Sequence, residues 1–216
     1  MPTQTKENYL KAMHFLTLKS EDVSVTALGK MMDVSKPTVN NMVKKLSDKG
    51  WIKYEKYKPL RLTKKGNKAA ALIIRKHRLT EMFLVKIMGF GWEEVHQIAE
   101  EMEHLKTELL FDRMDEILGY PTTDPHGSPI PDKDGKYNRK SYGLLSNAAI
   151  GSKVILRAVG DSSVALLNLL NEKEITLGTE FTVQKIEDFD KTMLVNFGKQ
   201  KSVTLSHEVC KRLMIE

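Results

Sequence analysis

The amino-acid sequence predicts a mainly helical fold with two small β regions, arranged as three successive parts. Apolar side chains recur at helical spacing through most of residues 4–118. A Pro- and Gly-rich stretch over residues 119–143 then marks a long loop. Beyond it, short β-like runs separated by turns indicate a small barrel. We therefore expect the three parts at residues 1–68, 69–143 and 144–216.

The first part has the pattern of two short helices joined by a tight turn. Helices are expected over residues 4–19, 24–32 and 35–49. Ser35 is a suitable N-cap for the third helix, and Pro37 falls in its first turn, where a missing N–H group costs nothing. This arrangement is typical of a helix-turn-helix.

Two alternating segments, residues 51–55 and 60–63, follow the helices and predict a β-hairpin with a basic tip. This hairpin would be the wing of a winged helix. Residues 1–68 hold 15 Lys and Arg against 6 Asp and Glu, for a net charge of +9, whereas the remainder holds 19 against 22, for −3. The charge therefore favours a polyanionic partner for the first part only, and double-stranded DNA is the leading candidate.

On DNA, the third helix would enter the major groove with its exposed N-terminal residues near the base edges. Asn pairs bidentately with adenine, and the methyl group of Thr contacts that of thymine. Lysines suit phosphate, which gives affinity without sequence choice. The candidate DNA-binding residues are Ser35, Lys36, Pro37, Thr38, Asn40, Asn41, Lys44, Lys45, Lys56 and Lys58.

Residues 92–104 are expected to form an amphipathic helix, because apolar side chains recur there at helical spacing without Pro or Gly. At roughly 100° per residue, one arc about 100° wide holds four potential metal ligands. These are His96, Glu100, Glu103 and His104. The alternative for such a pattern is a solvated charged face.

The preceding helix, expected over residues 63–88, carries a second pair of this kind, His77 and Glu81. Residues four apart are neighbours on a helix surface, and imidazoles among carboxylates suit a borderline-to-hard divalent metal. Two such pairs favour a metal site over a charged face. The helix also has a wide apolar surface with little to cover it, which favours a homodimer. A further helix is expected over residues 107–118.

In the last part we expect one helix at 163–171 and strands at 153–159, 180–186, 193–197 and 201–205. The loop before it contains Asp124. Turn chemistry before Pro125 explains this aspartate as well as a metal-ligand role does.

Several classes of protein are disfavoured. The longest apolar run, residues 69–74, is far too short to span a membrane. The single cysteine, Cys210, cannot form an internal disulfide, so we expect a cytoplasmic protein without a membrane partner. No phosphate-binding loop, dinucleotide fingerprint or Ser-His-Asp spacing is present, so we expect neither an enzyme nor a small-molecule substrate.

Three motifs in the chain are specific: Arg-Lys-His-Arg-Leu-x-Glu at 75–81, Val-His-x-x-Ala-Glu-x-x-Glu-His at 95–104 and Asp-Pro-His-Gly at 124–127. With these motifs, nearly the whole chain resembles the diphtheria-toxin-repressor family of metal-dependent transcriptional regulators, in its manganese- and iron-responsive branch. The resemblance implies a winged-helix DNA-binding domain, a helical metal-binding and dimerisation domain, and a small SH3-like barrel of the FeoA type.

The resemblance also implies two metal sites per subunit. The primary site would use Glu100, Glu103 and His104 with Asn8, and Asp124 stands where some members have a cysteine that reaches this metal. The ancillary site would use His77, Glu81, His96 and Asp161. Asn8 stands where relatives carry Asp or Met, and Glu100 where iron-responsive members carry a thiolate. Ligands limited to oxygen and nitrogen favour Mn²⁺, with Fe²⁺ as the alternative.

The expected function is a divalent-metal-dependent transcriptional repressor. Mn²⁺ or Fe²⁺ would order the homodimer for operator DNA and so control metal-uptake genes. One alternative is a metal-independent winged-helix regulator whose His and Glu pairs are structural, which a chelator would reveal. The other is a dinuclear metalloenzyme, which turnover of phosphoester substrates would reveal.

Overall fold

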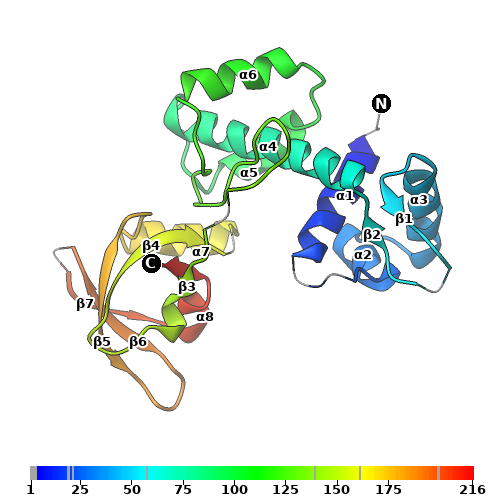
Figure 1. Ribbon diagram of the computed structural model, residues 1–216. Coiled ribbons are helices and arrows are strands. Elements are labelled where there is room, and N and C mark those ends of the chain that lie inside the picture. The colour runs from blue at the N-terminus through cyan, green and yellow to red at the C-terminus, as the bar shows by residue number, and fades with distance from the viewer. Residues whose placement is uncertain are drawn as a thin grey trace. The chain divides into compact units, whose positions relative to one another are not determined.

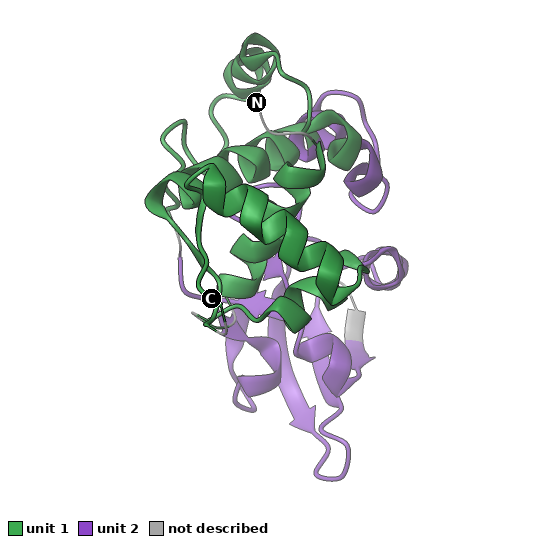
Figure 2. Ribbon diagram, turned by 90° about the vertical axis from the view of Figure 1, so that its right-hand side faces the viewer, with its two compact units in different colours: residues 1–80, 99–122, 130–138 green, residues 81–98, 123–129, 139–216 purple. Residues whose placement is uncertain are grey.

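A computed structural model describes residues 4–18, 20, 22–56, 58–138, 140–160, 162–198 and 200–216 of the 216-residue chain. Contacts within it define two compact units (Figure 2). Unit 1 comprises residues 1–80, 99–122 and 130–138, and unit 2 comprises residues 81–98, 123–129 and 139–216.

Figure 1 labels the helices and strands in chain order. The N-terminal elements are α1 (Gln4–Thr17), α2 (Val25–Met32), α3 (Lys36–Asp48), β1 (Ile52–Lys53) and β2 (Arg61–Leu62). They are followed by α4 (Lys64–Lys86), α5 (Val95–Met102) and α6 (Glu108–Ile117). The C-terminal elements are β3 (Gly143–Leu144), η1 (Leu145–Asn147), β4 (Lys153–Val159), α7 (Val164–Glu172), β5 (Glu180–Ile186), β6 (Met193–Phe197), β7 (Gln200–Leu205), α8 (His207–Cys210) and β8 (Leu213–Ile215).

The helix-turn-helix is confirmed, and its sequence explains where each helix begins. Ser24 caps α2 by accepting a hydrogen bond from the N–H of Ala27 at 3.0 Å. Ser35 caps α3 in the same way, and Pro37 lies in its first turn. Their inward faces pack with α1 in a core of buried side chains that includes Tyr9, Leu10, Met13, Leu28, Val39, Val43 and Leu46.

The wing is confirmed as an antiparallel pair, but its strands are shorter than expected. Ile52 pairs with Leu62 and Lys53 with Arg61, whereas Trp51 is a bend and residues 54, 55 and 63 belong to no strand. Leu60 instead pairs with Val23, just before α2. Residues 60–62 therefore pair with two different segments, Leu60 with Val23 and the next two residues with β1.

Helix α4 begins in close contact with the wing, which explains why residue 66 is a glycine. A Cβ atom on Gly66 would lie 1.9 Å from the carbonyl oxygen of Trp51. Thr63 fixes this junction, since its hydroxyl donates to the carbonyl of Gly50 at 2.7 Å and accepts from the N–H of Gly66 at 3.0 Å. None of the described helices, α4 included, is long and apolar enough to cross a membrane.

Helix α5 begins at Val95, three residues later than expected, and it ends at Met102, so Glu103 and His104 lie in the turn that follows it. Glu94 closes a turn with Gly91 instead, because its carboxylate accepts from the N–H of Gly91 at 2.7 Å while its own N–H donates to the Gly91 carbonyl at 3.1 Å. The predicted helix at 107–118 is confirmed as α6.

Unit 2 contains a six-stranded antiparallel sheet in the order β3-β8-β4-β5-β6-β7. The four predicted strands and the helix α7 are confirmed. The order ends at β3 and β7, so the described strands form an open sheet and not the closed barrel that we expected. The sequence did not indicate β3, β8 or α8, which have only two, three and four residues.

Candidate metal centre and nucleic-acid interface

The N-terminal half of α3 has the exposure that contact with DNA requires. Ser35, Lys36, Pro37 and Thr38 are exposed, as are Asn41, Lys44 and Lys45, and only Asn40 is half-buried. Side chains on the opposite face are buried in the core of the helix-turn-helix, namely Val39, Val43 and Leu46. The helix therefore presents one polar face with several Lys and Asn side chains.

Two details modify the expected interface. The hydroxyl groups of Ser35 and Thr38 lie 2.9 Å apart and share a hydrogen bond, so Ser35 is engaged in the cap of the helix. Lys56 and Lys58 are exposed at the wing tip, and the ammonium group of Lys58 lies 2.5 Å from the carboxylate of Glu55. That ion pair reduces the positive charge of the wing.

Unit 2 brings together three buried potential metal ligands: Glu81 at the C-terminal half of α4, and Asp124 and His126 in the loop that follows α6. One ligand atom from each lies within 4.8 Å of the others. The Nδ1 atom of His126 is 3.7 Å from Glu81 Oε2 and 4.0 Å from Asp124 Oδ1. His96 from α5 joins them, with its Nδ1 atom 3.3 Å from Glu81 Oε1. Its side chain is 47% exposed, so the cluster has one edge open to solvent.

Local hydrogen bonds hold the loop of this cluster in place. The carboxylate of Asp124 accepts from the N–H groups of His126 and Ser128, both at 2.9 Å. A Cβ atom on Gly127 would lie 2.2 Å from the carbonyl oxygen of Arg157, so the loop packs directly against β4. The Asp-Pro-His-Gly motif therefore serves both as a turn and as the support of two possible ligands.

Trp92 sets the orientation of the His126 ring. The Nε2 atom of His126 lies 2.9 Å from the Trp92 carbonyl oxygen, and the two rings stack at 5.9 Å. A carbonyl only accepts, so Nε2 carries the proton, and in the neutral ring Nδ1 presents its lone pair toward the carboxylates. Trp92 is held in turn by its indole N–H, which donates to Asn171 at 2.7 Å.

The electrostatics of this cluster favour a cation. Burial by itself lowers the pKa of His126, but the hydrogen bond to Glu81 and the negative charges of Asp124 and Glu81 outweigh it, so the pKa is raised above its usual value. The carboxylates thus create a buried negative potential beside imidazole nitrogens. That combination of oxygen and nitrogen donors suits Mn²⁺, Fe²⁺ or Zn²⁺.

Three of the residues expected at the primary site, Glu100, Glu103 and His104, lie in unit 1 and contact other protein groups. Glu103, whose side chain is 1% exposed, accepts from the ammonium group of Lys11 through both oxygens at 2.8 Å. It also lies 2.7 Å from Nδ1 of His77. Burial raises the pKa of Glu103, but the hydrogen bond to His77 and the positive charge of Lys11 outweigh it, so the pKa is lowered. Glu100 lies 3.3 Å from the same ammonium group.

His104 contacts Glu7 and not Asn8, the residue of α1 that was expected beside it. Its Nδ1 atom lies 2.5 Å from Glu7 Oε2 on α1, whereas Asn8 is exposed. Sequence reasoning missed Glu7, Lys11 and His126. Glu7 and Lys11 are four residues apart in a predicted helix, a spacing that could have identified a polar face there.

Asp161, expected at the ancillary site, lies outside the described residues. The role assigned to Asp124 at the primary site stays a prediction, and the structure places its carboxylate beside His126 and Glu81.

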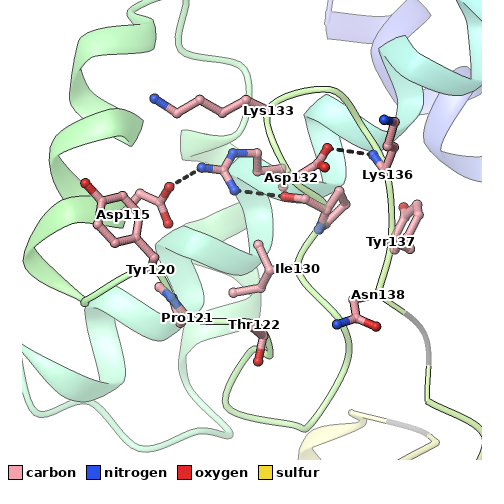
Figure 3. Close-up of a pocket in the computed structure, with 12 residues that line it drawn as sticks. Asp115, Tyr120, Pro121, Thr122, Ile130, Asp132, Lys133, Lys136, Tyr137 and Asn138 are labelled. Carbon is pink, nitrogen blue, oxygen red and sulfur yellow. Dashed lines mark hydrogen bonds and ion pairs between the residues drawn. The ribbon is translucent and has the colours of Figure 1, made fainter.

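Unit 1 also contains a pocket of about 540 Å³ (Figure 3). Arg75 and Asp115 form a buried ion pair at its wall, and Arg75 also donates to the carbonyl oxygen of Pro131 at 2.8 Å. Asp132 accepts from the N–H groups of Asp134 and Lys136, both at 2.8 Å. These contacts connect α4, α6 and the long loop, and they indicate a structural role.

Comparison with known protein families matches three successive segments. Residues 1–60 match the model described as "Iron dependent repressor, N-terminal DNA binding domain". Residues 63–132 match "Iron dependent repressor, metal binding and dimerisation domain", and residues 144–216 match the FeoA domain.

Individual relatives agree with this assignment. The iron-dependent repressor IdeR of Mycobacterium tuberculosis is 28% identical over 224 residues, which cover 98% of this chain and 96% of the relative. The regulator MntR of Oceanobacillus iheyensis is 32% identical over 120 residues, 56% of this chain and 81% of the relative. A solved manganese-dependent transcriptional repressor in complex with manganese superposes with a TM-score of 0.88 at 29% identity, covering 97% of this chain and 98% of that one.

IdeR and the solved structure are transcriptional repressors and MntR is a transcriptional regulator, so the family consists of regulators and not of enzymes. Together with the winged helix and the cluster around Glu81, the matches show that the chain belongs to the diphtheria-toxin-repressor family of metal-dependent transcriptional regulators.

Proposed function

We propose that this chain represses transcription as a homodimer that binds operator DNA when Mn²⁺ or Fe²⁺ is bound. The observation that carries the proposal is the buried set of oxygen and nitrogen donors around Glu81, since a family assignment alone does not establish that this chain has kept a metal site. Control of metal-uptake genes would follow from such a response.

Four residues fit a divalent cation: Glu81, His96, Asp124 and His126. His77 lies one turn before Glu81 on α4 and so belongs to the same face of that helix, which supports the ancillary set expected from the sequence. A bound divalent ion would supply positive charge to the buried carboxylates. The chain's own part is to hold Nδ1 of His126 toward them through the Trp92 carbonyl.

The ligand chemistry supports Mn²⁺ as the first candidate, with Fe²⁺ as the second. None of these ligands is a thiolate, and burial raises the pKa of Cys210 to about 11. Oxygen and nitrogen ligands suit hard and borderline ions, although intrinsic affinity rises from Mn²⁺ to Fe²⁺. The relatives include both an iron-dependent and a manganese-dependent repressor.

Exposed apolar side chains in unit 1 support dimerisation. Leu109 and Ile117 on α6 are 67% and 61% exposed, and Tyr120 just beyond it is 66% exposed. Surfaces of this kind are typical of protein–protein contacts. A two-fold dimer would present two α3 helices to two half-sites of an operator.

The test is fluorescence-anisotropy titration of DNA from upstream of the protein's own gene and of neighbouring metal-transporter genes. It is run at fixed salt with a chelator, with Mn²⁺, and anaerobically with Fe²⁺. We expect tight binding only with metal, and the more effective ion identifies the co-repressor.

Glu81→Gln should remove the metal response, and Glu101→Gln, an exposed glutamate on α5, is the matched control that should keep it. Equal binding of the unaltered protein with and without chelator would contradict the proposal and leave a metal-independent regulator.

A further inference from the structure

The primary set of metal ligands expected from the sequence already surrounds a positive charge that belongs to the chain. Lys11 reaches from α1 to Glu100 and Glu103 at the C-terminal end of α5, all within unit 1. We propose that the ammonium group of Lys11 takes the place of a metal ion there, so that the set Glu100, Glu103 and His104 binds no metal. This inference deepens the proposed function, because it restricts the metal response to the ligands around Glu81.

The geometry satisfies the ammonium group completely. A lysine ammonium has three N–H donors. They face three oxygen acceptors: both oxygens of Glu103 at 2.8 Å and Oε1 of Glu100 at 3.3 Å. The two shorter distances are those of charge-assisted hydrogen bonds. Lys11 is 13% exposed and Glu103 is 1% exposed, so water scarcely competes with the two contacts between them, whereas Glu100 is 52% exposed and supplies the solvent-facing third contact.

The remaining members of the set are also engaged. Glu103 has His77 as a further partner at 2.7 Å, and Nδ1 of His104 is bonded to Glu7 at 2.5 Å. A divalent ion between Glu100 and Glu103 would lie next to the Lys11 ammonium, and like charges at such a distance repel strongly in a buried site. The residues present therefore do not fit a metal at this position.

These contacts connect helix α1 of the DNA-binding part to the C-terminal end of α5 and the turn after it. Helix α1 packs in the core of the helix-turn-helix, through residues such as Tyr9 and Leu10. The contacts of Lys11 and Glu7 join that helix to Glu103 and His104 without any metal. This connection is therefore permanent, and of the two metal sites expected per subunit only the one around Glu81 responds to metal.

The experiment counts Mn²⁺ ions bound per subunit, by equilibrium dialysis with elemental analysis. The variants are Glu100→Gln, Lys11→Gln and the two combined. We expect Glu100→Gln to leave the number of bound ions unchanged. Lys11→Gln removes the internal cation and should add about one ion per subunit, which the double variant should lose again. Loss of one ion from Glu100→Gln alone would overturn the proposal.

Two further variants guard against effects of misfolding. Lys11→Arg keeps the positive charge and should bind as many ions as the unaltered protein, and Lys6→Gln, on the same helix, should also change nothing. Circular dichroism checks that every variant is folded. A folded Lys11→Gln protein that gains no ion would also overturn the proposal.

The result separates this inference from the proposed function. Glu81→Gln should lower the Mn²⁺ count whichever residue stands at position 11. If the unaltered protein binds neither Mn²⁺ nor, anaerobically, Fe²⁺, the proposed function is wrong, yet a gain of an ion by Lys11→Gln would still support the replacement of metal by Lys11.

Discussion

Two buried glutamates in this protein differ in the groups that surround their negative charge. Glu103 in unit 1 is paired with a lysine that belongs to the chain, whereas Glu81 in unit 2 lies among imidazoles and a second carboxylate. A lysine ammonium has only donors and no lone pair, whereas an imidazole that has released one proton can offer a nitrogen lone pair to a metal ion. The first arrangement therefore carries its own cation, and the second leaves a negative site that an external cation can neutralise.

The largest expected effect is on the free energy of unfolding, and it tests how much a buried cation of the chain, the guanidinium group of Arg75, contributes to stability. Arg75→Met leaves Asp115 buried without its guanidinium partner, so we expect the free energy of unfolding to fall by about 3–5 kcal/mol. Urea unfolding measures it. Arg113→Met, which breaks the exposed pair with Glu116, is the matched control and should change stability by about 0.5 kcal/mol or less. Equal losses in the two variants would show that burial does not decide the strength of these pairs.

Lys11→Met should have the next largest effect. It removes hydrogen bonds to a buried charged acceptor, and we expect a loss of about 2 kcal/mol in the absence of metal. Saturating Mn²⁺ should restore part of this loss, because the ion then binds where the ammonium was. Thermal or urea unfolding with and without Mn²⁺ measures both effects. A variant as stable as the unaltered protein in chelator would contradict the importance of this contact.

Asn41→Ala on α3 should have a smaller effect, and on DNA binding alone. We expect a loss of about 1.5 kcal/mol in operator affinity and weaker discrimination at one base pair. Lys44→Ala is the comparison, because a phosphate contact should weaken binding to all sequences alike and reduce the salt slope by about 1. Anisotropy titrations at several salt concentrations distinguish the two. If both variants lost affinity equally for every sequence, α3 would not read bases at Asn41.

The smallest effect concerns Cys210, which is buried in the core of unit 2. Burial raises the pKa of its thiol to about 11. At pH 8 only about one molecule in a thousand then carries the reactive thiolate. We expect no labelling by iodoacetamide in the folded protein and complete labelling in urea, measured by mass spectrometry. Rapid labelling without denaturant would show that unit 2 opens readily.

The sequence predicted the elements whose signals are local. Helical periodicity, the Ser35 cap and Pro37 defined α3, and strands of five or more residues were long enough to show alternation. Strands as short as β3 and β8 carry no such signal. They exist because they pair with each other and, through β8, with β4.

The sequence predicted which types of residue form the candidate sites, but not which residues contact one another. The spacing of His77 with Glu81 is a property of α4 alone, and that of His96 with Glu100 is a property of α5 alone. The contacts of Lys11 with Glu103 and of His126 with Glu81 join segments far apart in the chain, and only tertiary packing creates them. Moreover, Pro125 and Gly127 made the segment around His126 look like an ordinary turn.

The place of β8 in the sheet has a consequence for the order of folding during synthesis. β3 pairs only with β8, and β8 is the last of the described strands to leave the ribosome. The winged helix, whose contacts are mostly local, can fold while the rest of the chain is still being made. Until synthesis reaches β8, β3 has no strand to pair with, and β4 presents an unpaired edge on the side that β8 later covers.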